Sequence, residues 1–596
     1  MGDRTFSVLL GCSFSLVGAA TLPLPVAAEM ELTVVYPPDG HQTTAEQIFF
    51  IGTGMPGQPV QINNQPIENR ISDGHFAPSL PLSLGENIFT LIQGDEQLTL
   101  RVTRLPAQPA APGGVAFADG SLRPAVNIAR QPGELICFGA IAPENAQVAV
   151  NLAGETISLQ AQTIAVALPP NLAVLVGDNA PSPVDSAIHY EGCTVARESG
   201  NLGTPQFQLT LNGQTIRQPG SGSVTILPTT PFQVAEVLTP TGGTARTGPS
   251  TSYSRITPLP PGTRARITAR EGDWLRLDYG GWIRGSETRQ FTATVPPRSL
   301  IRSARSRQVP GQVPDWTEVL FPLEVPVPVS IEQDRDRLIL TLYNTVAQTD
   351  TIYFDTNPVI ERMDWRPILP NQAEYTFNFR GNQQWGYKLR YEDTTLILSL
   401  RHPPAISAAS RPLAGTTVVL DPGHGGEELG ARGPTGYPEK SVNLVVSTLL
   451  RDELEARGAT VVMTRETDVA VSLRDRIDRI NQVEPTLALS IHYNALPDNG
   501  DALNTAGIGA FWYDAQAHDL AEFLHNYLVT NLNRPSYGVF WNNLALTRPH
   551  VAPTVLLELG FMINPTEFEW IIDPASQQQL VTTLADGIEA WLIQAL

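Results

Sequence analysis

Four side chains in the last third of the chain, His424, Glu439, His492 and Glu558, are of types that bind metal ions or transfer protons. His424 stands among the glycines of "DPGHGG", directly after an apolar run, and Glu439 opens a segment with helical spacing. His492 and Glu558 each come at the end of an apolar run. Two histidines and a carboxylate can form a zinc site with an open fourth position, and a second carboxylate can serve as the general base. The pattern therefore predicts metal-assisted hydrolysis.

Each of these residues alone also has a purely structural interpretation. His424 alone could belong to a tight turn, and Glu439 alone is an ordinary first-turn acid that the helix dipole favours. His492 could be a hydrogen-bonded core histidine, and Glu558 could pair with an arginine. A carboxylate after three apolar residues is nevertheless costly to bury unless it is paired, protonated or near a metal. The joint occurrence of all four residues in these contexts favours the metal site.

The elements that position these residues follow from the periodicity of residues 416–596. Apolar runs such as "TVVLD", "ATVVM" and "TLALSIHYN" alternate with helical patterns such as "KSVNLVVSTLLRDELEARG". Alternating strands and helices predict an α/β domain, in which functional groups gather at strand ends and in the loops that leave them.

Residues 416–596 resemble the zinc-dependent N-acetylmuramoyl-L-alanine amidases, which cleave stem peptides from peptidoglycan. The resemblance is carried by "VVLDPGHGG", "EKSVNL", "MTRETD", "LRDRIDRIN", "SIHYNA" and "LLELGFMINP", in the family's order. It implies one Zn²⁺ per catalytic domain, with His424, Glu439 and His492 as ligands and Glu558 as the catalytic acid/base.

The resemblance also implies a substrate and a reaction. We expect hydrolysis of the amide between the lactyl group of N-acetylmuramic acid and L-alanine, in cell-wall remodelling or cell separation. Asn494, Arg465 and His550 are candidate substrate-binding residues. Two alternatives stay open: a catalytically silent peptidoglycan-binding scaffold, and a zinc peptidase that acts on the stem peptide.

Some relatives carry an inserted helix that plugs the site between the second histidine and the catalytic glutamate. The corresponding segment here, Leu496 to Gly507, is a short polar stretch without helical periodicity. We therefore hypothesise a metal site that is not blocked by such a helix. Whether an activator or a divisome protein acts on the enzyme is left open.

The sequence before the last domain predicts several small all-β modules, because short alternating runs are separated by turn residues. We expect an immunoglobulin-like β-sandwich at 29–106, a β-rich module at 115–231, a barrel at 234–290 and a β-sandwich at 313–403. The barrel resembles bacterial Src-homology-3-like modules through its "GDW" and "GWI" motifs. The last of the four resembles the wall-targeting modules that precede amidases. The stretch containing Arg298 to Arg307 is interpreted first as a solvated linker and second as a patch for an anionic polymer.

The N-terminus has the features of a secretory signal peptide at 1–28. Arg4 precedes an apolar run, and Val26 and Ala28 fit a cleavage site before Glu29. We therefore expect an exported protein, in the periplasm, at the cell wall or outside the cell. No later segment has the roughly 18 consecutive apolar residues of a membrane span.

Export makes the cysteine content informative. Cys137 and Cys193 are the two cysteines that remain after cleavage. An oxidising compartment permits a disulfide between them, although two separate buried thiols are an alternative.

The overall charge excludes one class of function. The chain has 596 residues and a formal net charge of -20. A nucleic-acid-binding protein needs a basic face to neutralise phosphates, so this composition argues against one.

Overall fold

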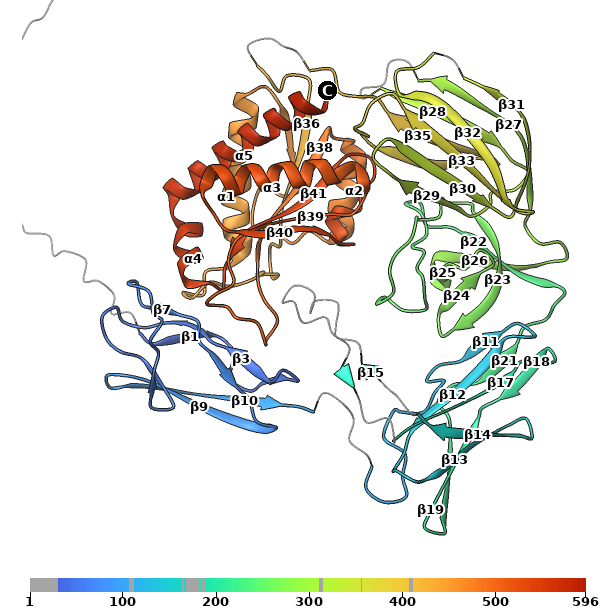
Figure 1. Cartoon of the computed structure of the whole chain (residues 1–596), viewed down its shortest axis with the longest axis horizontal. Helices are drawn as coiled ribbons and strands as arrows, with labels where there is room; N and C mark the ends of the chain where they lie inside the picture. The colour runs from blue at the N-terminus through green and yellow to red at the C-terminus, as the bar shows by residue number, and fades with distance from the viewer. Residues whose placement is uncertain are drawn as a thin grey trace, which may run out of the picture.

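The computed structural model describes residues 31–106, 112–162, 166–167, 182–183, 188–309, 315–354, 356–406 and 411–596. In these residues strands dominate as far as Arg401, and strands alternating with helices follow from Thr417 (Figure 1). The expected order of β-rich regions followed by an α/β domain is confirmed. The predicted signal peptide lies outside the described residues.

The first region, 31–106, contains three small sheets around one core, which includes Phe50, Phe76 and Leu91. These sheets are β1 (Thr33–Tyr36), β4 (Ile51–Thr53) and β7 (His75–Phe76); β2 (His41–Thr43), β10 (Glu96–Arg104), β9 (Gly85–Gln93), β5 (Gln61–Ile62) and β6 (Gln65–Pro66); and β3 (Gln47–Phe49) with β8 (Ser79–Pro81).

The second region contains a six-stranded sheet and a separate strand pair. In spatial order the sheet is β12 (Leu135–Ile141), β17 (His189–Val195), β14 (Glu155–Ala161), β13 (Gln147–Leu152), β19 (Gln206–Leu211) and β20 (Gln214–Pro219); the pair is β15 (Val166–Ala167) and β16 (Ser182–Pro183). Cys137 and Cys193 are register partners in β12 and β17 and form a disulfide. The bond therefore links two adjacent strands of one sheet.

An eight-stranded sheet joins parts of two expected modules. It consists of β18 (Gly200–Gly203), β21 (Val224–Ile226), β11 (Ile128–Arg130), β23 (Arg264–Glu271), β22 (Phe232–Val237), β26 (Thr288–Ala293), β24 (Trp274–Leu277) and β25 (Trp282–Arg284), with the short 3-10 helix η3 (Gly285–Glu287) before β26. Since β11 pairs with β23, backbone hydrogen bonds cross from the segment before Pro231 to the segment after it.

Two further sheets pack face to face around one core between Ser299 and Arg401. They are β31 (Thr345–Tyr353), β27 (Ser299–Gln308), β28 (Trp316–Pro322), β35 (Thr395–Arg401) and β34 (Tyr387–Glu392); and β29 (Val329–Gln333), β30 (Arg337–Tyr343), β33 (Gln372–Phe379) and β32 (Ile360–Leu369). The basic stretch expected as a linker is β27. Ile301 and Ala304 are buried while Arg302 and Arg305 are exposed, so alternation along a strand explains the arginines.

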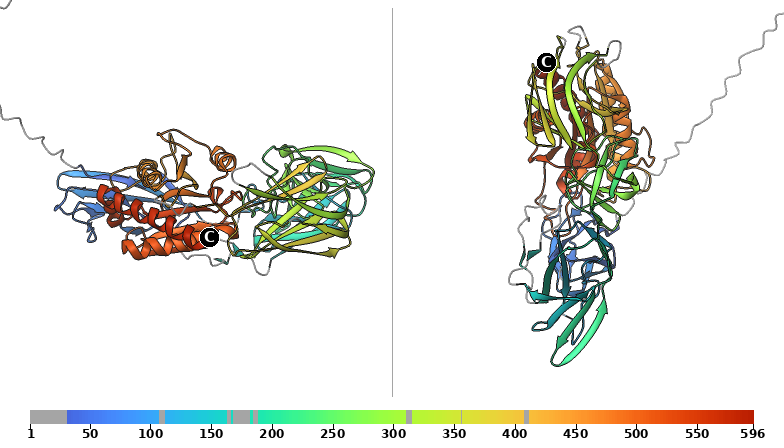
Figure 2. Two further views of the ribbon diagram at one scale, coloured as in Figure 1. Left: turned by 90° about the horizontal axis from the view of Figure 1, so that it is seen from above. Right: turned by 90° about the vertical axis from the view of Figure 1, so that its right-hand side faces the viewer.

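The C-terminal domain is a six-stranded sheet covered by helices on both faces (Figures 1 and 2). Its order is β37 (Thr460–Met463), β36 (Thr417–Pro422), β38 (Leu487–Asn494), β41 (Thr554–Phe561), β39 (Ile508–Trp512) and β40 (Ser536–Trp541). All neighbours are parallel except β39 and β41. The helices are α1 (Glu439–Ala456), α2 (Leu473–Val483), α3 (His518–Leu532), α4 (Pro565–Ile572) and α5 (Pro574–Ala595), with 3-10 turns η4 (Ala515–Ala517) and η5 (Ala545–Thr547).

Side-chain alternation in the strands divides these helices between the two faces. Val418 and Leu420 pack into one core with α1, α3 and α5, whereas Val419 packs into another with α2. The helix starts are encoded locally: Ser472 caps α2 by accepting a hydrogen bond from the Asp475 amide, and Pro574 follows the capping Asp573 of α5. None of the helices in the described ranges combines the length and apolar content needed to cross a membrane.

The first region lies against the last one, so the chain returns on itself (Figure 1). Apolar side chains from both form a shared buried cluster: Phe49, Ile51, Ala77, Ala502, Phe561 and Ile563. His75 Nε2 lies 2.7 Å from Glu569 Oε1, and His41 Nε2 lies 3.0 Å from Asp498 Oδ2. The N-terminal β region therefore packs beside the loops that follow β38 and β41.

Candidate metal centre

The fold brings His424, Glu439 and His492 together. His424 follows β36, Glu439 is the first residue of α1, and His492 lies near the carboxyl end of β38. One ligand atom from each lies within 4.8 Å of the others. His424 Nε2 is 3.1 Å from Glu439 Oε2, and His492 Nδ1 is 3.1 Å from Glu439 Oε1. Two imidazole nitrogens and a carboxylate form a donor set that suits zinc and leaves one coordination position open.

Glycines make room for this cluster. A Cβ on Gly423 would lie 2.2 Å from His492 Cε1, and a Cβ on Gly430 would lie 2.4 Å from Glu439 Oε2. Real Cβ atoms do not approach other atoms so closely, and Gly430 also has a φ of +70°. His424 itself has a φ of +59°, in the left-handed region that few non-glycine residues adopt. Gly423 and Gly430 thus permit close approach of the three side chains.

Glu439 is held rigidly by hydrogen bonds from its surroundings. Its carboxylate accepts from the amides of Ala431 (2.8 Å) and Tyr493 (3.1 Å) and from Asn443 Nδ2 (3.0 Å). Burial opposes the charged form, but hydrogen bonds and charge from the two histidines lower the pKa of Glu439 below its usual range. Glu439 is therefore an anionic, preorganised side chain that could bind a metal ion.

His424 has a second acidic neighbour that sequence reasoning missed. Glu428 Oε1 lies 3.0 Å from His424 Nδ1, on the side of the ring away from Glu439. Burial disfavours the imidazolium, yet Glu439 and Glu428 together raise the pKa of His424 above its ordinary value. Carboxylates in this position orient metal-binding histidines and fix their tautomer. The spacing of four residues between His424 and Glu428, within the glycine-rich stretch, was the signal in the sequence that could have indicated this contact.

A buried polar network beneath His424 was also missed. Asp421 accepts hydrogen bonds from Arg476 (2.6 Å), Thr464 (2.5 Å) and Ser490 (2.7 Å). Arg476 Nη2 also donates to the His424 carbonyl oxygen at 2.6 Å. Since the Asp421 and Arg476 side chains are only 2% and 3% exposed, this ion pair is a rigid support for the histidine loop.

Glu558 lies beside the cluster but is not hydrogen-bonded to it. In β41 it is the register partner of His492 in β38 and of Gly509 in β39. Its Oε2 atom is buried, with no hydrogen-bond partner among the described residues. Burial, reinforced by the negative charge of Glu439, raises the pKa of Glu558 well above its ordinary value. A cation bound by the cluster would lower the pKa of Glu558. The geometry leaves Glu558 available for proton transfer.

The three candidate substrate-binding residues lie in different places. Asn494 ends β38, and its buried Nδ2 has no partner among the described residues. Arg465 is buried and donates to the carbonyl oxygens of Pro422 and Gly423, which supports the histidine loop. The structure does not bring His550 to the cluster. Its ring stacks on Tyr387 with centroids 4.5 Å apart, before the amino end of β41, whereas Glu558 is near the carboxyl end.

Comparison with known proteins finds a family match within this domain. Residues 418–590, which contain the three residues of the cluster and Glu558, match the family model described as N-acetylmuramoyl-L-alanine amidase. The C-terminal domain is therefore similar to that family over residues 418–590.

Individual relatives match about a third of the chain. A protein of Staphylococcus epidermidis named "Probable cell wall amidase LytH" is 34% identical over 195 residues, which are 32% of this chain and 64% of that protein. Its Staphylococcus aureus counterpart is 36% identical over 182 residues, 30% of this chain and 60% of the relative. The chain thus spans less than two thirds of these curated relatives.

Solved structures are similar over 30% of the chain. The N-acetylmuramoyl-L-alanine amidase from Clostridium difficile 630 has 30% sequence identity and a TM-score of 0.29, with 30% of this chain and 98% of that one covered. The amidase AmiC2 of Nostoc punctiforme has 30% identity and a TM-score of 0.29, with 30% and 97% covered.

Proposed function

We propose that this protein is a zinc-dependent N-acetylmuramoyl-L-alanine amidase that hydrolyses the amide between N-acetylmuramic acid and the L-alanine of the stem peptide. The observation that carries the proposal is the convergence of His424, Glu439 and His492 within 4.8 Å, with Glu558 on the adjacent strand. The family match of residues 418–590 supports the choice of substrate.

The residues have separate roles in the proposed reaction. His424, Glu439 and His492 hold the zinc ion, which supplies Lewis-acid polarisation of the amide carbonyl and of water. Glu558 takes a proton from the attacking water and delivers it to the departing L-alanine amine. Asn494, whose buried Nδ2 has no partner among the described residues, donates a hydrogen bond to the substrate.

The proposal extends to where the enzyme acts. The N-terminal features of a signal peptide and the cell-wall names of the relatives support an exported enzyme at the cell wall. Residues 496–507, all of which are described, contain turns and no helix. The same segment accepts hydrogen bonds from the N-terminal region, for example from Gln47 Nε2 to the Asn499 carbonyl oxygen at 2.7 Å. We propose that no inserted helix blocks this metal centre.

The test compares the full-length wild type with Glu558→Gln, and with Glu522→Gln as a control on the exposed surface of α3. We expect one zinc per chain in all three, with free L-alanine amino termini released from purified peptidoglycan by the wild type and the control only. Removing a general base typically costs a factor of about 10² to 10⁴ in rate. Cleavage within the stem peptide would favour a peptidase instead. Zinc binding without any release would favour the silent scaffold.

A further inference from the structure

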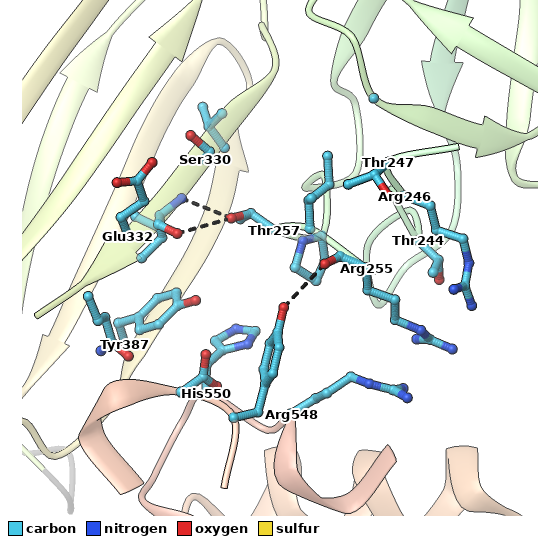
Figure 3. Close-up of a pocket in the computed structure, with 18 of the residues that line it drawn as sticks. Thr244, Arg246, Thr247, Arg255, Thr257, Ser330, Glu332, Tyr387, Arg548 and His550 are labelled. Carbon is cyan, nitrogen blue, oxygen red and sulfur yellow. Dashed lines mark hydrogen bonds between the residues drawn. The ribbon is translucent and has the colours of Figure 1, made fainter. Parts of the chain in front are cut away.

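A cavity of about 720 Å³ lies at the meeting point of three regions (Figure 3). Its walls come from the loop 244–258, from β29 with neighbouring tyrosines, and from the end of the C-terminal sheet where β39 and β40 finish. No residue of the metal cluster lines it. Gly509 in β39 is the register partner of Glu558. Trp512, which lines the cavity, is three residues further along the same strand, so at 3.3 Å per residue it lies about 10 Å from Gly509. The cavity is therefore separate from the metal centre.

Three arginines give the cavity a cationic wall. Arg246, Arg255 and Arg548 line it, and Figure 3 shows their guanidinium groups on the same side. No carboxylate of the described residues lies within 4.0 Å of any of these groups, although the chain as a whole has a net charge of -20. Burial, then repulsion from Arg255 and Arg246, lowers the pKa of Arg548 to about 10. The negative charge of Glu287 attracts Arg246 and Arg255, but one carboxylate does not balance three guanidinium groups that lie on one side of the cavity.

The two acidic residues of the lining do not neutralise this wall. Glu332 is exposed and lies across the cavity from the arginines (Figure 3). Burial raises the pKa of Asp514 to about 7, so this carboxyl carries only a partial charge near neutral pH. The excess positive charge would favour a bound anion.

The arginines differ in how the protein holds them. Arg246 Nη1 donates to the Thr251 and Tyr253 carbonyl oxygens, and Arg548 Nε donates to Asn543 Oδ1 at 2.7 Å. The guanidinium of Arg255 has no hydrogen bond or salt bridge to any described residue. Arg246 and Arg548 are thus fixed in place, while all the donors of Arg255 remain available to a ligand.

An exposed aromatic surface lies next to the arginines. Trp541 is 60% exposed, is tilted against Tyr513 with ring centroids 5.4 Å apart, and donates from Nε1 to the Tyr513 carbonyl oxygen. Trp512 also lines the cavity. An indole held in this way offers a flat apolar face against which the C–H face of a sugar ring can pack, beside donors that suit an anionic group.

From this arrangement we propose that the cavity is a second binding site, for an anionic saccharide whose carboxylate or phosphate pairs with Arg255 and Arg548 while its ring packs on Trp541. The choice of a saccharide rests on the proposed function, because an enzyme of peptidoglycan meets sugars that carry acidic groups. The site would hold a part of the wall other than the bond being cleaved. A volume of about 720 Å³ is ample for one or two sugar rings.

The test is calorimetric titration of the full-length protein with four probes: N-acetylmuramic acid, N-acetylglucosamine 6-phosphate, neutral N-acetylglucosamine and inorganic phosphate. None contains the bond that the amidase cleaves. We expect binding of at least one acidic sugar. If N-acetylmuramic acid binds more tightly, the group recognised is a carboxylate; if N-acetylglucosamine 6-phosphate binds more tightly, it is a phosphate. Neutral sugar bound equally well would overturn the role of the arginines. Inorganic phosphate bound as tightly as the sugar phosphate would overturn saccharide recognition, and no binding of any probe would overturn the site.

Variants separate this proposal from the proposed function. Arg255→Gln and Arg548→Gln should each weaken binding of the acidic sugar at least tenfold, while Arg362→Gln, an exposed arginine on β32, should not. Arg255→Lys keeps the charge and should retain part of the affinity. That result would show that the weaker binding of Arg255→Gln is not a folding artefact. Release of the stem peptide, with its free L-alanine amino terminus, from a small soluble muropeptide should be unchanged in Arg255→Gln. A wild type that binds the sugar but releases no such peptide would refute only the amidase; unchanged binding in both glutamine variants would refute only the second site.

Discussion

The buried pair of Asp421 and Arg476 allows a test of how the metal centre is supported. Asp421→Asn removes the charge that compensates Arg476, and Arg476→Met removes the cation and its hydrogen bond to the His424 carbonyl oxygen. Both side chains are at most 3% exposed, so water cannot replace the lost partner. Each single change leaves an uncompensated buried polar or charged group.

The expected magnitude follows from this burial. Breaking a buried ion pair on one side typically costs about 3–5 kcal/mol, and removing both charges costs less than the sum of the single changes. We expect each variant to lose about 3 kcal/mol or more in the free energy of unfolding of residues 417–596. The double variant should recover about 2 kcal/mol of the summed loss. Because Arg476 holds the His424 loop, the zinc affinity of the Arg476→Met variant should also fall about 10- to 100-fold.

The assay is amide hydrogen exchange of the full-length protein across β36, β38 and α1, with zinc affinity measured by competition against a chelating dye. Local exchange is preferable to a melting temperature, since a chain with several domains does not unfold in two states. Arg479→Met, at an exposed position of the same helix, is the control and should change stability by less than about 0.5 kcal/mol. Additive losses in the double variant, or single losses below about 1 kcal/mol, would refute the reasoning.

Two further predictions concern other sites. Burial raises the pKa of Asp514 from 3.8 to about 7, so the folded protein keeps this proton to higher pH than the unfolded chain and loses stability as pH rises from about 4 to 7. Asp514→Asn should therefore stabilise the protein by at most about 4 kcal/mol at pH 8 and not at pH 4. An equal increase in the thermal unfolding temperature at both pH values would contradict this. Gly430→Ala should weaken zinc binding at least tenfold, because its Cβ would lie 2.4 Å from Glu439 Oε2 and 2.6 Å from His424 Cδ2. Gly436→Ala is the matched control, with a similar φ of +83° but its nearest neighbour at 3.9 Å; equal effects of the two changes would assign the loss to backbone strain.

The sequence by itself determined the α/β character of the last domain and the residue types of its metal centre. Both are local properties: "TVVLDPGHGG" shows a buried strand that ends in a glycine-rich turn, and Glu439 begins a segment of helical period. A parallel sheet gathers residues from strand ends at one edge, so the proximity of His424 and His492 could be expected before the structure. The alternation of buried and exposed residues in β27 was also present in the sequence, but its arginines favoured the interpretation as a linker.

Only the tertiary structure decided which side chains support the site and which face elsewhere. Arg476 and Asp421 are 55 residues apart, and nothing in the local pattern distinguishes this arginine from Arg479 on the same helix. His550 precedes the strand of Glu558 yet faces another cavity, because the loop before β41 is at the opposite end of the strand from the metal cluster. The arginine-lined cavity combines residues from three regions of the chain. Such contacts depend on how separately encoded elements pack together, and local periodicity carries no information about that packing.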